Sequence, residues 1–198
     1  MGVESADTMR ILMLGNSFTA ANSLPALIAD LTDATVLQHT RSGARLAEHL
    51  NPNTEMGAKT LRALETERWD YVILQEMSNA PIVSKSAFQR SIKALCERMD
   101  AIPILFATWG YQTATKRLLK LGISSDRMAS MISDACHEAA KISGALVADV
   151  GLAFSRLAES ECLYAPDGVH PNLRGSTIAA HVIANVIAEH SDLPNTRR

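Results

Sequence analysis

The sequence predicts an α/β fold with a five-stranded parallel sheet and helices on both of its faces. Short apolar runs alternate along the chain with longer segments of helical spacing, which is the pattern of consecutive β-α-β units. The runs contain few polar positions, as expected for strands buried on both faces of a parallel sheet. No repeat, linker or low-complexity segment divides the sequence. We therefore expect residues 1–198 to form one domain, with flexible tails at residues 1–8 and 191–198.

The first predicted strand is the one around which the rest of the chain is organised. It begins at Arg10, is apolar from Ile11 onward and stops at Gly15, and Asn16-Ser17 then forms a turn before the next helix. In an open parallel sheet, ligands bind at the carboxyl ends of the strands, where Ser17 would lie. The other strands are expected at residues 34–39, 70–75, 103–108 and 145–150.

Helices are predicted between these strands. In the first of them, Leu24, Ile28 and Leu31 share one apolar stripe, and Pro25 lies near the first turn, where proline is tolerated. The predicted helical segments are 20–31, 44–50, 56–68, 84–99, 127–143, 152–159 and 173–190. The predicted loops include 76–83, 160–172 and a longer polar insertion at 112–126, for which a lid and an oligomer contact are both open.

Composition excludes several classes of function. The net charge is -2 and charged residues make up 20% of the chain, so nothing favours binding to nucleic acid or to an anionic membrane. No apolar run is long enough to span a bilayer, and the first eight residues lack the apolar segment of a signal peptide. We therefore expect a soluble, cytoplasmic protein.

The three cysteines, Cys96, Cys136 and Cys162, are widely spaced and include no C-x-x-C pair. An odd number at such spacing is typical of reduced cysteines that mostly fill the core. We expect neither a disulfide framework nor a zinc site.

A serine hydroxyl becomes an effective nucleophile when a base, usually a histidine oriented by a third group, lies within hydrogen-bond reach. Of the six histidines, His170 is distinguished by its loop, which precedes the last predicted helix and carries Asp167 three residues earlier. A carboxylate at that spacing can reach the imidazole and fix its tautomer. Each piece alone has a structural explanation, because Gly-Asn-Ser can cap a helix and Asp-Gly can form an ordinary turn. Together they predict that Ser17 and His170 meet at the carboxyl edge of the sheet.

Acyl transfer also needs hydrogen-bond donors for the developing oxyanion. The backbone N–H groups of Ser17 and Gly43 and the side chain of Gln75 or Asn79 could supply them. Gly43 could equally be a turn residue with positive φ. Gln75 could also pair with the backbone at its strand end.

The order of these pieces resembles the SGNH (GDSL-like) hydrolase superfamily over roughly residues 10–189. The shared features are Gly-x-Ser after the first strand, a glycine after the second, a polar block after the third, and Asp-x-x-His before the last helix. The stretches 69–76 and 108–111 are similar to a branch described only as a domain of unknown function.

The resemblance implies a flavodoxin-like three-layer α/β/α sandwich with a Ser-His-Asp triad. Carried onto this sequence, Ser17 is the nucleophile, His170 the base and Asp167 its partner. Where the family usually has Asp after the first glycine, this chain has Asn16, which should be tolerated because that residue is not the nucleophile.

The resemblance also implies an oxyanion hole with Gly43 as a donor beside the backbone of Ser17. The Gly-x-Asn-Asp block that the family carries after the third strand is absent, and residues 75–79 are instead similar to the Gln-Gly-Glu-Ser block of sialate O-acetylesterase-like relatives. In those relatives the glutamine amide serves the oxyanion. We therefore expect Gln75 to be the third donor, with Asn79 as the weaker candidate.

The resulting prediction is a serine esterase that hydrolyses short-chain acyl esters, acetyl esters on a carbohydrate first, through an acyl-enzyme. No metal or organic cofactor is expected, and the partner is a small-molecule acyl ester; the oligomeric state is open. Trp109 and Tyr111 would line the substrate pocket, although both could be core residues. Arg41 and Arg45 could attract an anionic substrate or be ordinary solvated charges.

Three alternatives stay open at this point. The first is a non-catalytic carbohydrate- or ligand-binding domain, because a fold does not dictate function. The second is a thioesterase or lysophospholipase with the same site. The third is a nucleotide- or flavin-binding protein, which the first turn does not support because it lacks a glycine-rich phosphate loop.

Overall fold

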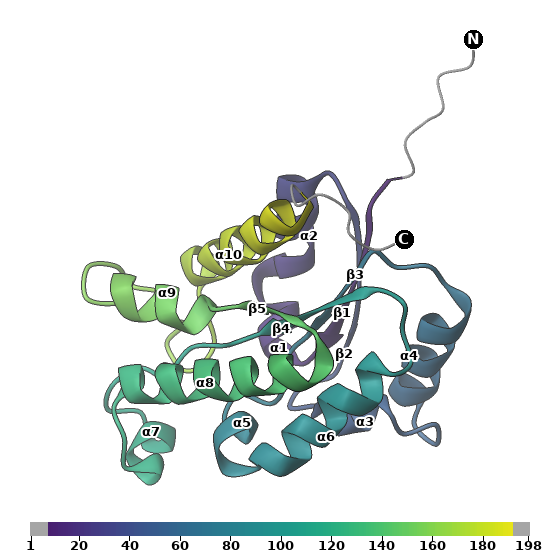
Figure 1. Ribbon diagram of the computed structural model, residues 1–198. Helices are drawn as coiled ribbons and strands as arrows, with labels where there is room; N and C mark the ends of the chain where they lie inside the picture. Colours follow the sequence, from purple (N-terminus) through teal and green to yellow (C-terminus); the bar gives the residue numbers. More distant parts are fainter. Residues whose placement is uncertain (1–7, 192–198) are drawn as a thin grey trace.

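The computed structural model describes residues 8–191, whose strands form one parallel sheet (Figure 1). Its order is β2-β1-β3-β4-β5, the strand order of flavodoxin-like folds. The predicted α/β fold with a five-stranded parallel sheet is confirmed. The strands are β1 (Arg10–Gly15), β2 (Thr35–Thr40), β3 (Tyr71–Leu74), β4 (Ile102–Phe106) and β5 (Leu146–Ala148).

The register of the sheet brings the ends of three strands to one edge. Gly15 at the end of β1 pairs with Thr40 at the end of β2, and Leu14 pairs with Leu74 at the end of β3. The segments that follow β1, β2 and β3 therefore leave the sheet side by side. The central strands are buried, as their apolar sequences predict, whereas β2 is exposed at several positions because it lies at the edge.

Helices connect the strands, and several of them begin at side-chain caps. Thr54, Thr115 and Ser124 each accept a hydrogen bond from a backbone N–H three residues later, which satisfies a donor that the helix leaves unpaired. The helical segments are α1 (Ser17–Ala20), η1 (Ala21–Ser23), α2 (Leu24–Thr32), α3 (Leu46–His49), α4 (Glu55–Thr66), α5 (Ala80–Val83), α6 (Lys85–Cys96), α7 (Lys116–Leu121), α8 (Ser125–Ser143), α9 (Val150–Leu157) and α10 (Leu173–Ser191).

The helices form the two outer layers of the sandwich. Helices α2 and α10 lie side by side over one face of the sheet, and α6 and α8 cover the other (Figure 1). The core fills the space between the sheet and both layers. Within residues 8–191, no helix is both long and apolar enough to cross a membrane.

Helix boundaries differ from the sequence prediction in two regions. The first predicted helix starts earlier, at Ser17, and is interrupted where Asn22 and Ser23 adopt positive φ angles of 50° and 56°. The segments expected to be loops contain the short helices α5 and α7, so that part of the prediction is wrong. In α7, Thr115 caps a run of lysine, arginine and leucine, all good helix formers.

The predicted tails fall mostly outside the described residues, which exclude 1–7 and 192–198. Thr8 is exposed and belongs to no element. Ser191, the first residue of the second predicted tail, ends α10, and its hydroxyl donates to the carbonyl of Ile187. The three cysteines are free, and Cys136 is the buried one, where burial raises the pKa of its thiol.

Candidate active site

Ser17 is the first residue of α1, directly after the end of β1. Asn16 caps this helix through its side-chain oxygen, which accepts the N–H of Phe18 at 3.1 Å. Gly15 is required by close packing, because a Cβ there would lie 2.3 Å from the Thr19 hydroxyl and 2.7 Å from the side-chain oxygen of Gln75. The side chains of Thr19 and Gln75 thus pack closely against the turn that precedes Ser17.

The structure brings together three of the sequence-predicted site residues, 153 positions apart at the extremes. Ser17 Oγ lies 2.9 Å from His170 Nε2, and His170 Nδ1 lies 2.5 Å from Asp167 Oδ2. The second carboxylate oxygen, Asp167 Oδ1, accepts the backbone N–H groups of Val169 and His170, both at 2.9 Å. This chain of contacts can take a proton from the serine and stabilise the resulting imidazolium.

The electrostatics of Asp167 suit that arrangement. Partial burial works against its ionisation, but hydrogen bonds from the His170 ring and from the backbone of Val169 and His170 outweigh it. They lower the pKa of Asp167 to about 2. Asp167 is therefore a carboxylate throughout the neutral range and can only accept from His170 Nδ1–H.

The loop that carries His170 is tied to its surroundings by side-chain amides. Asn172 donates to the carbonyl of Cys162 at 2.8 Å and accepts the N–H of Gly175 at 2.9 Å, which caps α10. Asn22, from the segment after the nucleophile, donates to the carbonyl of Pro171 at 3.0 Å. Sequence analysis gave Asn22 no role at the site; its left-handed conformation, which asparagine tolerates, is known only from the structure.

Trp109 does not line a pocket, so that prediction is wrong. Its side chain is completely buried and is stacked between Phe18 and Phe154, with ring centroids 4.7 and 4.4 Å away. Its Nε1–H donates to the carbonyl of Val169 at 3.0 Å. Trp109 therefore contacts both the helix that begins at Ser17 and the loop of His170 from the core side.

Tyr111 is likewise a core residue, with 2% of its surface exposed. Its hydroxyl bonds to Ser78 Oγ at 2.5 Å and so joins the segments that follow β4 and β3. The prediction that Tyr111 lines the substrate pocket is therefore wrong as well. An aromatic residue at a strand exit can face inward or outward, and spacing alone did not decide between them.

Gln75 is engaged in a way that contradicts its expected role as an oxyanion donor. The residue is 1% exposed, and its side-chain oxygen accepts the N–H of Asn16 and the hydroxyl of Thr19, each at 3.0 Å. Its side-chain nitrogen donates to the carbonyl of Glu76. The amide therefore attaches the turn before Ser17 to the end of β3 and does not face an open site.

Three other donors at this edge of the sheet are free. Within residues 8–191, the backbone N–H groups of Ser17 and Gly43 make no hydrogen bond. Asn79, half-buried at the start of α5, makes no side-chain cap bond there. Gly43 has a positive φ of 69°, as the turn explanation for this glycine predicted.

Two buried side chains attach the loop that contains Gly43. The amide nitrogen of Asn16 donates to the carbonyl of Ala44 at 3.0 Å. Glu76 Oε1 accepts the backbone N–H of Leu46 at 3.3 Å and that of Met77 at 2.7 Å. Burial raises the pKa of Glu76, and these two N–H groups partly oppose the shift. Sequence analysis assigned neither residue such a role.

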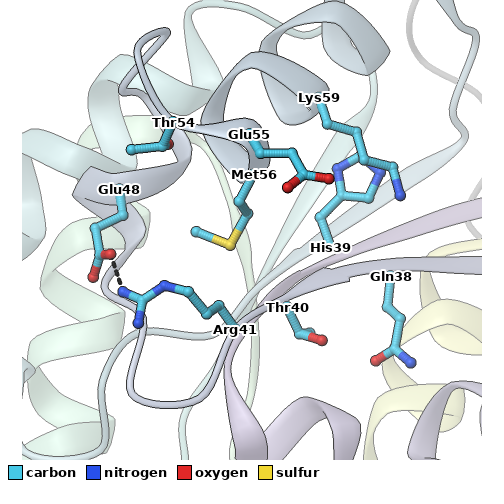
Figure 2. A pocket seen from close by; sticks show the side chains of 9 residues that line it. All are labelled: Gln38, His39, Thr40, Arg41, Glu48, Thr54, Glu55, Met56 and Lys59. Carbon is cyan, nitrogen blue, oxygen red and sulfur yellow. Dashed lines mark hydrogen bonds and ion pairs between the residues drawn. The ribbon is translucent and has the colours of Figure 1, made fainter.

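A hollow of about 570 Å³ lies beside this loop, between β2 and α4 (Figure 2). Arg41 lines it and forms an ion pair with Glu48, and Lys59 lies near His39 on the other side (Figure 2). With Glu55 also in the lining, positive and negative side chains are equal in number. The hollow therefore offers no excess of positive charge for an anionic substrate, which favours the reading of Arg41 as an ordinary solvated charge.

Comparison with known proteins finds relatives among solved structures. No protein-family model and no curated protein matches the sequence. A candidate SGNH hydrolase from Slackia heliotrinireducens is 46% identical to this chain and has a TM-score of 0.84. The matched region covers 91% of this chain and 100% of the relative. Its coverage and identity are high enough to establish a family.

Two more distant structures share the fold alone. A DUF4886 family protein from Bacteroides uniformis is 21% identical, covers 97% of this chain and 88% of that one, and has a TM-score of 0.69. An acetylxylan esterase from Geobacillus stearothermophilus is 14% identical, covers 90% of this chain and 94% of that one, and has a TM-score of 0.64.

Proposed function

Because the chain belongs to the SGNH hydrolase superfamily, we propose that it is a serine esterase acting through an acyl-enzyme. The observation that carries the proposal is the contact chain from Ser17 Oγ through His170 to Asp167, with distances of 2.9 and 2.5 Å. Ser17 is the nucleophile, His170 the general base and Asp167 the group that orients it.

The proposed acylation step uses these three residues. His170 Nε2 takes the proton of Ser17 as Oγ attacks the ester carbonyl, while Asp167 holds Nδ1–H and stabilises the imidazolium. The tetrahedral intermediate collapses, and His170 gives the proton to the leaving alcohol. A water molecule then enters, is deprotonated by His170, and attacks the acyl-serine to release the acid.

Three donors from three strand exits would hold the oxyanion: the N–H of Ser17, the N–H of Gly43 and the side-chain amide of Asn79. Their lack of hydrogen-bond partners within the described residues supports this assignment. Asn79 takes the place first given to Gln75, whose amide is used to fix the nucleophile turn. Donors held in place before the reaction stabilise the charge that develops only in the transition state.

The substrate class that we propose is short-chain acyl esters, acetyl esters of carbohydrates in first place. Support comes from the similarity of residues 75–79 to sialate O-acetylesterase-like sequences. An acetylxylan esterase has the same fold, so acetylated sugars are the first substrates to assay.

The test is hydrolysis of p-nitrophenyl acetate and its longer-chain homologues, with Ser17→Ala as the matched blank. We expect turnover that requires Ser17 and falls as the acyl chain lengthens. A rate that rises with chain length would favour a lysophospholipase-like enzyme, and better turnover of thioesters a thioesterase. Equal rates for the two proteins, without labelling of Ser17 by a fluorophosphonate, would indicate a binding domain instead.

A further inference from the structure

The loop between β2 and α3, residues 41–45, must hold the backbone N–H of Gly43 in position if that group is an oxyanion donor. Gly43 itself is exposed, and a Cβ built there would meet nothing within 4 Å. Its neighbours Ala44 and Leu46 are 1% and 0% exposed. The position of the Gly43 N–H must therefore be set through these flanking residues.

Contacts inside the loop fix its shape but not its placement. Ala44 N–H donates to the carbonyl of Arg41 at 3.0 Å, and the N–H of Arg45 donates to Glu48 at 3.0 Å. Both bonds join the loop to itself or to the helix that follows it. Neither connects it to the segments that carry the other two donors.

Asn16 makes the connection to the end of β1. This residue is 3% exposed, and both ends of its amide are used: the oxygen accepts Phe18 N–H, and the nitrogen donates to the Ala44 carbonyl. The first bond starts the helix of Ser17 and the second reaches the residue next to Gly43. An aspartate at this position could keep the first bond but has no hydrogen for the second.

Glu76 makes the connection to the end of β3. It is 6% exposed, and one oxygen accepts the N–H groups of both Leu46 and Met77. A buried carboxylate is costly unless hydrogen bonds compensate it, so its presence here calls for a reason. Glu76 lies three residues before Asn79 and thus ties the Gly43 loop to the segment of the third donor.

We propose that Asn16 and Glu76 are positioning residues that hold the Gly43 N–H in line with the donors of Ser17 and Asn79. The inference rests on the proposed esterase function. The two side chains do not touch the substrate; each bridges the exit of β2 to a neighbouring strand exit, one from β1 and one from β3. Removing either lets the loop, and with it Gly43, drift away from the oxyanion.

The first test is Asn16→Asp, which keeps the cap to Phe18 but places a carboxylate oxygen against the Ala44 carbonyl. We expect kcat to fall about 10–100-fold with KM nearly unchanged, less than the loss for deleting an oxyanion donor outright. Asn51→Asp is the matched control, because Asn51 is exposed and its side-chain oxygen likewise accepts a backbone N–H, that of Asn53. It should retain the wild-type kcat.

The second test compares two substitutions of Glu76. Glu76→Gln keeps an oxygen that can accept from Leu46 and Met77 and should stay within about threefold of the wild-type kcat. Glu76→Ala removes the acceptor and should lower kcat about 10–100-fold at unchanged KM. Rates are normalised to folded protein by circular dichroism, so a general loss of stability would not produce this pattern.

The outcomes separate this inference from the proposed function. If Ser17→Ala abolishes turnover while Asn16→Asp and Glu76→Ala retain the wild-type kcat, the esterase assignment stands and the positioning role is wrong. A loss that lies entirely in KM would also overturn it. If Ser17→Ala keeps its activity, the proposed function itself fails.

Discussion

The two halves of the site are held in place by different numbers of contacts. The His170 loop is fastened on several sides, by the Trp109 indole from the core, by Asn22 from the nucleophile segment and by Asn172 at the start of α10. The Gly43 loop is tied to its neighbouring strand exits by Asn16 and Glu76. The proton-transfer half is thus supported redundantly, whereas the oxyanion half depends on a few buried polar contacts.

The difference has a consequence for how each half should fail. A loop that is held by several contacts keeps its position when one of them is removed, because the remaining contacts still exclude other positions. A loop placed by single hydrogen bonds can lose its position when one donor is replaced. Substitutions in the two halves should therefore differ in what they change first.

The largest effect that we expect in the His170 half comes from Asp167→Asn. The amide can still accept the N–H groups of Val169 and His170, so the loop keeps its shape, but it cannot accept from both the backbone and Nδ1–H as the carboxylate does. We predict a loss in kcat of about 10²–10⁴-fold. The measurement is kcat for p-nitrophenyl acetate near neutral pH, with circular dichroism to check the fold. A loss of less than tenfold would mean that Asp167 does not orient His170.

The next effect concerns acid stability in the Gly43 half. His49, in α3, is completely buried. Burial lowers its pKa to about 4; the nearby His39 and Arg41 add to the shift, while the Gly15 backbone and Glu48 oppose it. As the pH falls, His49 therefore binds a proton in the unfolded chain before it does so in the folded protein. The free energy of unfolding therefore has no loss from His49 above pH 6.5, and it declines as the pH is lowered from 6.5 to about 4.

Urea unfolding at a series of pH values measures this effect. Between pH 6.5 and pH 4 the protonation of His49 should lower the free energy of unfolding by about 3 kcal/mol. His49→Gln can still bond to Thr60 and should lack that part of the decline. Parallel curves for the wild type and the variant would show that His49 does not titrate as its burial implies.

The smallest of the three expected effects tests how the core supports the His170 loop. Trp109→Phe keeps an aromatic ring between Phe18 and Phe154 but removes the donor to the Val169 carbonyl. We predict a loss of about 1–3 kcal/mol in the free energy of unfolding, as for other unpaired buried groups. The catalytic rate should fall only a few-fold, because other contacts still hold the His170 loop.

Trp69→Phe is the control for that substitution. Trp69 donates to the carbonyl of Ala63 at 3.0 Å and precedes the start of β3, at the opposite end of that strand from the site, so the same group is lost away from the site. Its variant should lose stability without a change in kcat. If Trp109→Phe left both stability and kcat unchanged, the core would not be what braces the His170 loop.

The sequence sufficed for those features that a pattern encodes directly. Apolar runs separated by helical segments predicted the parallel sheet, and its topology carried Ser17 to the edge where His170 and Asp167 were expected. These residues also stood in short motifs whose spacing limits how they can be arranged. The catalytic role of the three stays a prediction until it is measured.

Other features depend on side-chain direction, which the pattern does not encode. The motif correctly marked Gln75 as a polar residue at a strand exit, but only the structure shows its amide turned toward Asn16 and Thr19. Trp109 and Tyr111 follow a strand and could have faced either way. In such cases the choice is made by the neighbours that pack against the side chain, which come from distant parts of the chain.

The measurement that tests the central claim most directly is the location of the covalent adduct formed with a fluorophosphonate, determined by mass spectrometry of the digested protein. The account predicts a single adduct on Ser17, and much slower labelling in His170→Ala, because the base that activates the serine would be absent. Stoichiometric labelling of another residue, or ester hydrolysis that persists with Ser17 unmodified, would contradict it.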